Sequence, residues 1–177
     1  MFAPKSHDHT HCIEDAIDRA ELVCDARGAR LTDIRRHVLE LIWKRHEPIG
    51  AYDLLDELRA THRRAAPPTV YRALDFLMEH GLVHRIESLN AYVGCPHPEQ
   101  AHSGQFLICR ACGSIGELDD PEIAQLVKER AARQGFQAEH QTIEVRGLCA
   151  DCRRADVDGK MADNKVMGDS KAGRVVQ

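Results

Sequence analysis

The sequence contains no apolar run long enough to cross a membrane, which takes about 20 consecutive apolar residues. Its N-terminal stretch, MFAPKSHDHTHC, also lacks the apolar core of a secretory signal. These absences argue against a membrane protein and predict a reducing, cytoplasmic location. In such a compartment we expect the seven cysteines to serve as metal ligands or free thiols, because disulfides are rare there.

The chain also lacks the strong positive charge of a general polyanion binder. Its formal net charge is −4, although 29% of its residues are charged. One segment differs, because no acidic residue occurs between Glu57 and Asp75. The same segment carries four arginines: Arg59, Arg63, Arg64 and Arg72. This pattern is compatible with a small phosphate-contacting surface and equally with a solvated loop.

With 177 residues, of which 43% are hydrophobic, the chain has room for one ordinary domain or two small ones. In the first half, apolar residues at helical spacing predict four helices, over residues 13–27, 33–47, 51–62 and 70–80. A hairpin of two short strands, 82–86 and 91–94, follows them. Helices followed by a hairpin are typical of a winged helix-turn-helix DNA-binding domain, although helix bundles of this size also serve other roles.

The fourth predicted helix is the one expected to read DNA. Its apolar stripe faces the core, which leaves three side chains near its N-terminal end on the other side: Thr69, Tyr71 and Arg72. This is the end of a recognition helix that meets base edges. The same spacing is also compatible with a helix whose role is only structural.

The second half is predicted to form a small α/β unit. Strands over 106–109 and 115–118 flank a Cys-Arg-Ala-Cys turn, a helix runs from Pro121 to Gly135, and a last strand covers 136–145. This order fits a small antiparallel sheet with one helix on a face. The exposed edges of such a sheet favour pairing with a second copy of the chain.

The predicted fold class is therefore α+β, with an N-terminal winged helix-turn-helix domain and a small C-terminal α/β dimerisation domain. The expected boundaries are a flexible tail over 1–12, a winged-helix domain over 13–94, a metal-binding hinge over 95–104, a zinc-stapled dimerisation domain over 105–153 and a disordered tail over 154–177.

Two Cys-x-x-Cys pairs form the strongest motif in the chain. We call them together the four-cysteine site: Cys109, Cys112, Cys149 and Cys152. Each pair can place two thiolates on one turn, and two such turns make a closed tetrahedral site that selects zinc. The alternative is a set of free or redox-active thiols, but a redox dithiol normally needs only one pair. The motif therefore predicts a structural zinc.

A looser set of metal-ligand side chains surrounds the expected hinge. We call this set the hinge ligands: His84, Cys95, His102 and Glu117, with His97 in reserve. One thiolate, two imidazoles and a carboxylate suit zinc better than manganese or magnesium. A single histidine in a hairpin is usually a surface residue, so it is the clustering that predicts a second metal site.

Zinc beside a glutamate can also indicate a hydrolase or a deaminase. The deaminase pattern needs a proline directly before its Cys-x-x-Cys pair, whereas Ile108 precedes Cys109 here. The H-E-x-x-H motif of zinc proteases does not occur in the sequence either. A zinc enzyme is therefore only a minor alternative, and no small organic substrate is expected.

Motifs in both halves of the chain resemble the ferric uptake regulator family. Besides the two cysteine pairs, they are Arg30-Leu31-Thr32, Ala51-Tyr52-Asp53-Leu54-Leu55, Pro68-Thr69-Val70-Tyr71-Arg72-Ala73-Leu74 and Gly81-Leu82-Val83-His84. The resemblance covers residues 15–153, and within the family the chain is most similar to the zinc-sensing members. It implies a homodimeric, metal-dependent repressor in the bacterial cytoplasm, with zinc as corepressor. It also implies palindromic double-stranded DNA operators near zinc-uptake genes.

The resemblance also implies roles for individual residues. It places the hinge ligands in a regulatory zinc site and the four cysteines in a structural one, which makes two zinc ions per chain. It places Tyr52 and Arg72 on DNA. The alternative is an iron-, manganese- or peroxide-sensing repressor of the same family, but this chain lacks their His-rich run and carries Cys95. His140 falls where some members hold a third metal, and we interpret it as structural because the other ligands of that site are missing.

Overall fold

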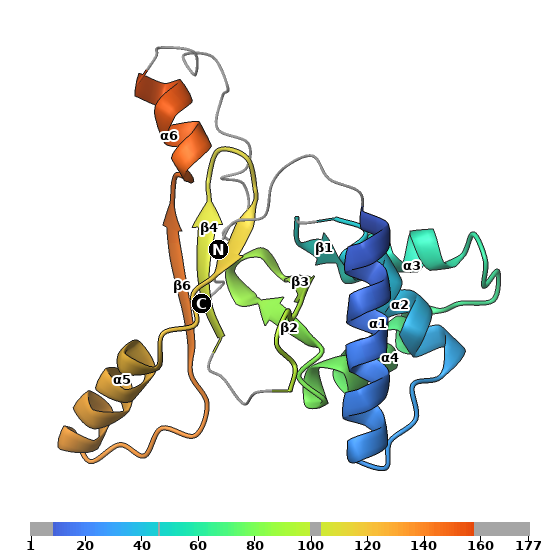
Figure 1. Ribbon diagram of the computed structural model, residues 1–177, viewed down its shortest axis with the longest axis horizontal. Coiled ribbons are helices and arrows are strands. Elements are labelled where there is room, and N and C mark those ends of the chain that lie inside the picture. Colours follow the sequence, from blue (N-terminus) through green and yellow to red (C-terminus); the bar gives the residue numbers. More distant parts are fainter. Residues whose placement is uncertain (1–8, 46, 100–103, 158–177) are drawn as a thin grey trace, which may run out of the picture.

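The computed structural model describes residues 9–45, 47–99 and 104–157. Figure 1 shows two parts side by side, a helical half over residues 9–94 and a C-terminal half over residues 104–157. They confirm the predicted α+β class, with a winged-helix unit first and a small α/β unit second. In the described ranges no helix is long and apolar enough to span a membrane.

The helical half begins with four helices. They are α1 (His9–Ala26), α2 (Asp33–Trp43), α3 (Ala51–Leu58) and α4 (Pro67–Glu79). Because α1 begins at His9, residues 9–12 are helical, although the sequence placed them in a flexible tail. The turn after α1 passes through Gly28, whose φ of 60° lies in the left-handed region that glycine adopts without strain.

The four helices pack around an apolar core made by their predicted inward stripes. The side chains that are 0% exposed include Val38 of α2, Leu54 and Leu58 of α3, and Leu74 and Leu77 of α4. Burying one such side chain contributes about 1.5–3 kcal/mol relative to leaving it in water. The core therefore holds α3 and α4 in fixed positions, with their opposite faces towards solvent.

A three-stranded antiparallel sheet forms the wing. Its strands are β1 (Ile49–Gly50), β2 (Val83–Ile86) and β3 (Ala91–Gly94), in the order β1-β3-β2. The predicted hairpin is confirmed as β2 and β3, which a short 3-10 turn, η1 (Glu87–Leu89), connects. β1 was not predicted, because two residues are too few to show an alternating pattern.

The C-terminal half is built on a second three-stranded sheet and two helices. The strands are β4 (Gly104–Cys109), β5 (Ile115–Glu117) and β6 (Thr142–Gly147), and the helices are α5 (Pro121–Arg133) and α6 (Ala150–Val157). β6 begins later than the predicted strand, because the alternation of apolar and polar residues starts only at Ile143. α6 was not predicted, since its sequence is short and polar, and it makes residues 154–157 helical instead of disordered.

The C-terminal sheet departs from the predicted antiparallel arrangement in one of its two pairings. β5 pairs with β4 antiparallel, but β6 pairs with β4 parallel, from Gly104 opposite Thr142 to Cys109 opposite Gly147. β5 already ends near the edge where β4 begins, and the connection through α5 carries the chain past β4, so that β6 starts at this edge and runs parallel to β4. As a result, β4 and β6 end at the same edge.

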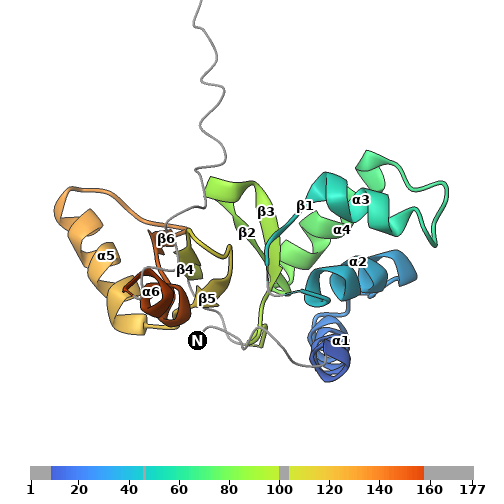
Figure 2. The same ribbon diagram turned by 90° about the horizontal axis from the view of Figure 1, so that it is seen from above.

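The wing packs against the C-terminal sheet, between that sheet and the four helices (Figure 2). The contact is a small shared core of five side chains: Ile86 and Val93 from the wing, and Phe106, Ile108 and Ile115 from the sheet. Ile86 is 0% exposed although it lies at the end of the wing hairpin. The two halves of the chain therefore share a buried contact in addition to their connecting segment.

The end of β3 is predicted to tolerate only glycine. A Cβ atom at Gly94 would lie 2.3 Å from Cε2 of Trp43, the single tryptophan of the chain. Gly94→Ala should therefore lower the free energy of unfolding by about 1–3 kcal/mol, the usual cost of overpacking. Urea unfolding followed by Trp43 fluorescence measures this change. Gly147→Ala is the control, because its Cβ would meet nothing within 4 Å, and equal stability losses in both variants would contradict the prediction.

Candidate metal centres

The four-cysteine site is brought together by the parallel pairing of β4 and β6. Cys109 ends β4, and Cys149 follows the end of β6 at the same edge of the sheet. Cys112 lies in the turn after β4 and Cys152 in α6. All four Sγ atoms lie within 4.8 Å of one another, and those of Cys112 and Cys149 are 3.8 Å apart. The structure thus assembles the four sulfurs that the two motifs predicted as one site.

The electrostatics of this cluster suit a bound cation. Burial would raise the pKa of Cys109, but backbone N–H groups, among them that of Cys149 at 3.3 Å from Sγ, outweigh it and lower the pKa to about 6. Burial, together with the neighbouring cysteines, raises the pKa of Cys152 to about 12. The first thiolate therefore forms readily, whereas four thiolates together require a positive ion. Within the described residues no disulfide joins any cysteine, and four soft sulfurs fit zinc.

Three of the hinge ligands meet at the joint between the two halves. His84 comes from β2, Cys95 directly follows β3, and Glu117 ends β5. Their ligand atoms lie within 4.8 Å of one another, with His84 Nε2 3.4 Å from Glu117 Oε1. We call these three residues the hinge triad. The fourth predicted ligand, His102, lies outside the described residues.

The environment of the hinge triad also favours a cation. Burial raises the pKa of Cys95 to about 12, and the nearby Glu117 carboxylate adds to the increase. A buried thiol therefore stays protonated beside a carboxylate unless a positive charge is supplied. A thiolate, an imidazole and a carboxylate are a ligand set that zinc accepts. His97, which the sequence offered as an alternative ligand, has its Nδ1 atom 3.7 Å from Oε1 of Glu99, and its side chain is 58% exposed.

Two residues near the hinge triad were not predicted from the sequence. Arg19 of α1 donates a hydrogen bond to the carbonyl oxygen of Pro96, the residue after Cys95. Its positive charge also opposes the rise in the pKa of Cys95. The second residue is Phe106, whose ring centroid lies 5.3 Å from the ring centroid of His84. The sequence carried no signal for either contact, because both join residues that are far apart along the chain.

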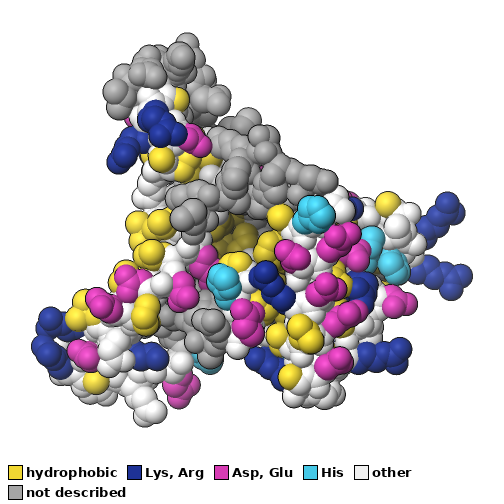
Figure 3. All heavy atoms as spheres, viewed as in Figure 1, with side chains coloured by type: hydrophobic (Ala, Val, Ile, Leu, Met, Phe, Trp, Pro, Cys, Tyr) yellow, Lys and Arg dark blue, Asp and Glu magenta, His cyan; other side chains and the backbone are white. Residues whose placement is uncertain are grey.

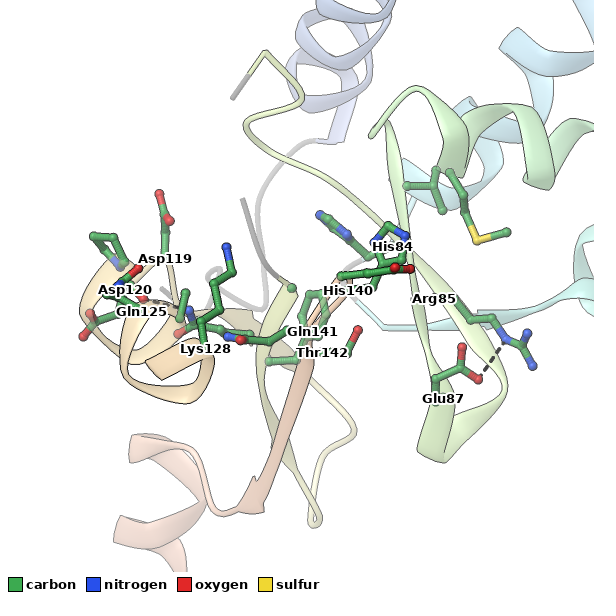
Figure 4. A pocket seen from close by; sticks show the side chains of 18 residues that line it. His84, Arg85, Glu87, Asp119, Asp120, Gln125, Lys128, His140, Gln141 and Thr142 are labelled. Carbon is green, nitrogen blue, oxygen red and sulfur yellow. Dashed lines mark hydrogen bonds and ion pairs between the residues drawn. The ribbon is translucent and has the colours of Figure 1, made fainter. Parts of the chain in front are cut away.

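A cavity of about 760 Å³ lies beside the joint. Figure 4 shows wing residues such as His84 on one side, α5 residues such as Lys128 on the other, and His140 between them. In the described part of the chain, His140 belongs to no group of three or more converging metal ligands.

The residues predicted to contact DNA lie at the surface of α3 and α4. Tyr52 is 68% exposed and Tyr71 is 41% exposed, whereas Thr69 is half-buried. Arg72 is exposed one residue after Tyr71. Lysine and arginine side chains project from the helical half in Figure 3. The outer face of α4 therefore combines hydrogen-bonding groups and positive charge, which suits contact with bases and phosphates.

Comparisons with known proteins agree with this arrangement. The model of the ferric uptake regulator family matches residues 26–146. The chain is 44% identical over 140 residues to the zinc uptake regulation protein of Escherichia coli (strain K12), which covers 78% of this chain and 82% of that protein. A solved zinc uptake regulator complexed with zinc and DNA is 40% identical, with a TM-score of 0.77 over 86% of this chain and 99% of that one. The structure of holo XcZur is 50% identical, with a TM-score of 0.73 over 80% of this chain and 99% of that one.

The four-cysteine site yields a prediction about folding. Cys112→Ser should lose one tightly held zinc per chain and unfold the C-terminal half, since structural zinc contributes on the order of 10 kcal/mol of apparent folding free energy. Metal analysis and circular dichroism measure both effects. Cys12→Ser, which changes a cysteine outside the site, should behave like the wild type. A Cys112→Ser protein with wild-type stability would rule out the structural role.

Proposed function

Because the chain belongs to the ferric uptake regulator family, we propose that it is a zinc-responsive, DNA-binding transcriptional repressor that controls zinc-uptake genes, with zinc as its corepressor. The observation that carries this proposal is the position of the hinge triad. Its ligands come from both sides of the joint between the helical half and the C-terminal half. An ion held there connects the part that reads DNA to the part expected to form the dimer.

The ligand chemistry supports zinc rather than manganese as the sensed metal. The buried Cys95 supplies a soft thiolate, which suits zinc and is a poor ligand for the harder manganese ion. The similarity to proteins named as zinc uptake regulators points the same way. We propose two zinc ions per chain: a structural ion in the four-cysteine site, and a regulatory ion bound by the hinge triad together with His102.

The proposed mechanism is a shift between arrangements of the two halves. A bound zinc ion supplies positive charge that allows the buried thiolate, imidazole and carboxylate of the hinge triad to stay together. Zinc binding would therefore favour the arrangement in which these ligands meet. The size of the shift equals the difference between the affinities of zinc for this arrangement and for the others. If this arrangement is also the one that binds DNA, zinc and DNA must tighten each other's binding.

The C-terminal half is proposed to pair two chains into a homodimer. It carries five exposed, large apolar side chains: Leu118, Leu126, Val127, Phe136 and Val145. Apolar residues at the surface of such a small unit suit contact with a second copy. A two-fold dimer presents two copies of α4, which matches a palindromic operator in double-stranded DNA.

On each half-site, we propose that α4 reads the DNA. Tyr71 and Arg72 would reach base edges or phosphates from the exposed face of α4, with Thr69 at its N-terminal end. Tyr52 would add a contact from α3. The proposal includes no catalytic role, since four sulfurs close the structural site and the hinge triad together with His102 would fill the four positions of the regulatory one. A repressor acting on DNA also agrees with the expected cytoplasmic location.

Replacing Cys95 tests the regulatory site. Cys95→Ser should keep the structural zinc but lower the affinity for the second zinc ion by more than about tenfold, because a neutral hydroxyl replaces a thiolate. Zinc stoichiometry and zinc-dependent binding to a duplex selected by the wild-type protein from a random pool measure this effect. His97→Ala removes an exposed neighbouring imidazole and should change neither. A wild-type zinc response in Cys95→Ser would refute the proposed switch.

Replacing Arg72 tests the DNA-reading face. Arg72→Ala should weaken binding to the selected duplex by about 1–3 kcal/mol and relax its sequence preference, if the guanidinium contacts a base edge. Zinc content and oligomeric state should not change. Arg133→Ala removes one positive charge from the C-terminal half and serves as the control. Unchanged affinity in Arg72→Ala would show that α4 does not read the DNA.

A further inference from the structure

The two halves are also joined by a hydrogen-bonded contact that involves no metal ligand. Glu144 of β6 reaches across to η1, the turn at the tip of the wing hairpin. One carboxylate oxygen accepts a hydrogen bond from the backbone N–H of Glu87 at 2.7 Å, and the other accepts one from the N–H of Ser88 at 3.2 Å. The carboxylate thus binds two neighbouring amides of the wing at once.

This contact satisfies groups that the wing cannot satisfy locally. The first N–H groups of a 3-10 turn have no partner within the turn, and the preceding residue, Ile86, has no polar side chain to offer. A carboxylate from the other half of the chain takes that role. Hydrogen bonds to an ionised group are stronger than those between neutral groups. The contact therefore has a defined geometry and favours one position of the wing.

The contact lies in the same row of the sheet as the hinge triad. In the pairing of strands, Phe106 on β4 lies opposite Glu117 on β5 and opposite Glu144 on β6. Residues paired in this way point to the same face of a sheet. On that face, Glu117 meets His84, Phe106 packs in the same small core as Ile86, and Glu144 caps η1.

We propose that Glu144 is a positioning residue for the zinc response: it holds the wing against the C-terminal sheet without a metal and keeps the hinge triad assembled. This inference rests on the proposed zinc-dependent function. The apparent affinity of a ligand falls by the fraction of molecules in which its site is formed. Without this contact that fraction should fall about tenfold, which corresponds to about 1.4 kcal/mol at 25 °C. Zinc should then bind the hinge site about tenfold more weakly.

The test compares Glu144→Ala, Glu144→Gln and the control Glu122→Gln, each purified with the four-cysteine site loaded. Glu122 is an exposed carboxylate at the start of α5, so its variant controls for the loss of one charge. Amide hydrogen exchange at Glu87 and Ser88 measures the contact itself. Zinc titration followed by Trp43 fluorescence measures hinge-site affinity, because Trp43 lies against Gly94, next to Cys95. Binding to the selected duplex at saturating zinc measures DNA affinity.

Glu144→Ala should speed exchange at both amides and weaken zinc binding about tenfold, while DNA affinity at saturating zinc stays within about twofold of wild type. Glu144→Gln keeps the side-chain volume and one acceptor oxygen, so its loss of zinc affinity should be smaller, about threefold. If the alanine variant does not fold, the result for Glu144→Gln decides the test. Wild-type exchange or wild-type zinc affinity in the folded variants would overturn the inference. A wild-type protein whose DNA binding ignores zinc would instead overturn the proposed function, whatever the exchange data show.

Discussion

The parallel pairing of β4 with β6 is the constraint on which the C-terminal half depends. Because both strands run the same way, their ends lie together, and each end carries one cysteine pair of the four-cysteine site. An antiparallel β6 would place Cys149 at the opposite edge of the sheet from Cys109. The same register sets Glu144 beside Phe106, in the row that faces the wing. The pairing of one strand thus determines both the four-cysteine site and the contacts of this half with the wing.

Three contacts of different physical kinds meet at the joint between the halves. The shared apolar core and the Glu144 contact involve no metal ligand, and both favour the closed joint. The hinge triad works the other way in the absence of a cation, because closing the joint buries a carboxylate next to a thiol and an imidazole. A cation held by the hinge triad would reverse the sign of that last contribution. The joint is therefore suited to respond to a metal, since contributions of opposite sign act at the same place.

The sequence predicted the features that depend on local patterns. Apolar stripes gave the helices, the hairpin followed from its turn, and the cysteine pairs predicted a site whose sulfurs do converge. The parallel pairing of β6 with β4 could not be predicted, because it depends on which strand the connection after β5 brings β6 beside and not on the residues of β6. The contacts of Arg19 and Glu144 were missed for a related reason, since they join residues 77 and 57 positions apart. α6 was missed because its short polar sequence has no apolar stripe.

The distance along the chain between the two cysteine pairs has a consequence for biosynthesis. Cys109 and the backbone N–H of Cys149 that contacts it are 40 positions apart, and Cys152 comes later still. The helices and wing of the helical half, by contrast, form from one continuous earlier stretch. Domains generally fold in the order in which the ribosome releases them. A nascent chain is therefore expected to form its helical half first, and to assemble the four-cysteine site only after Cys152 has been synthesised.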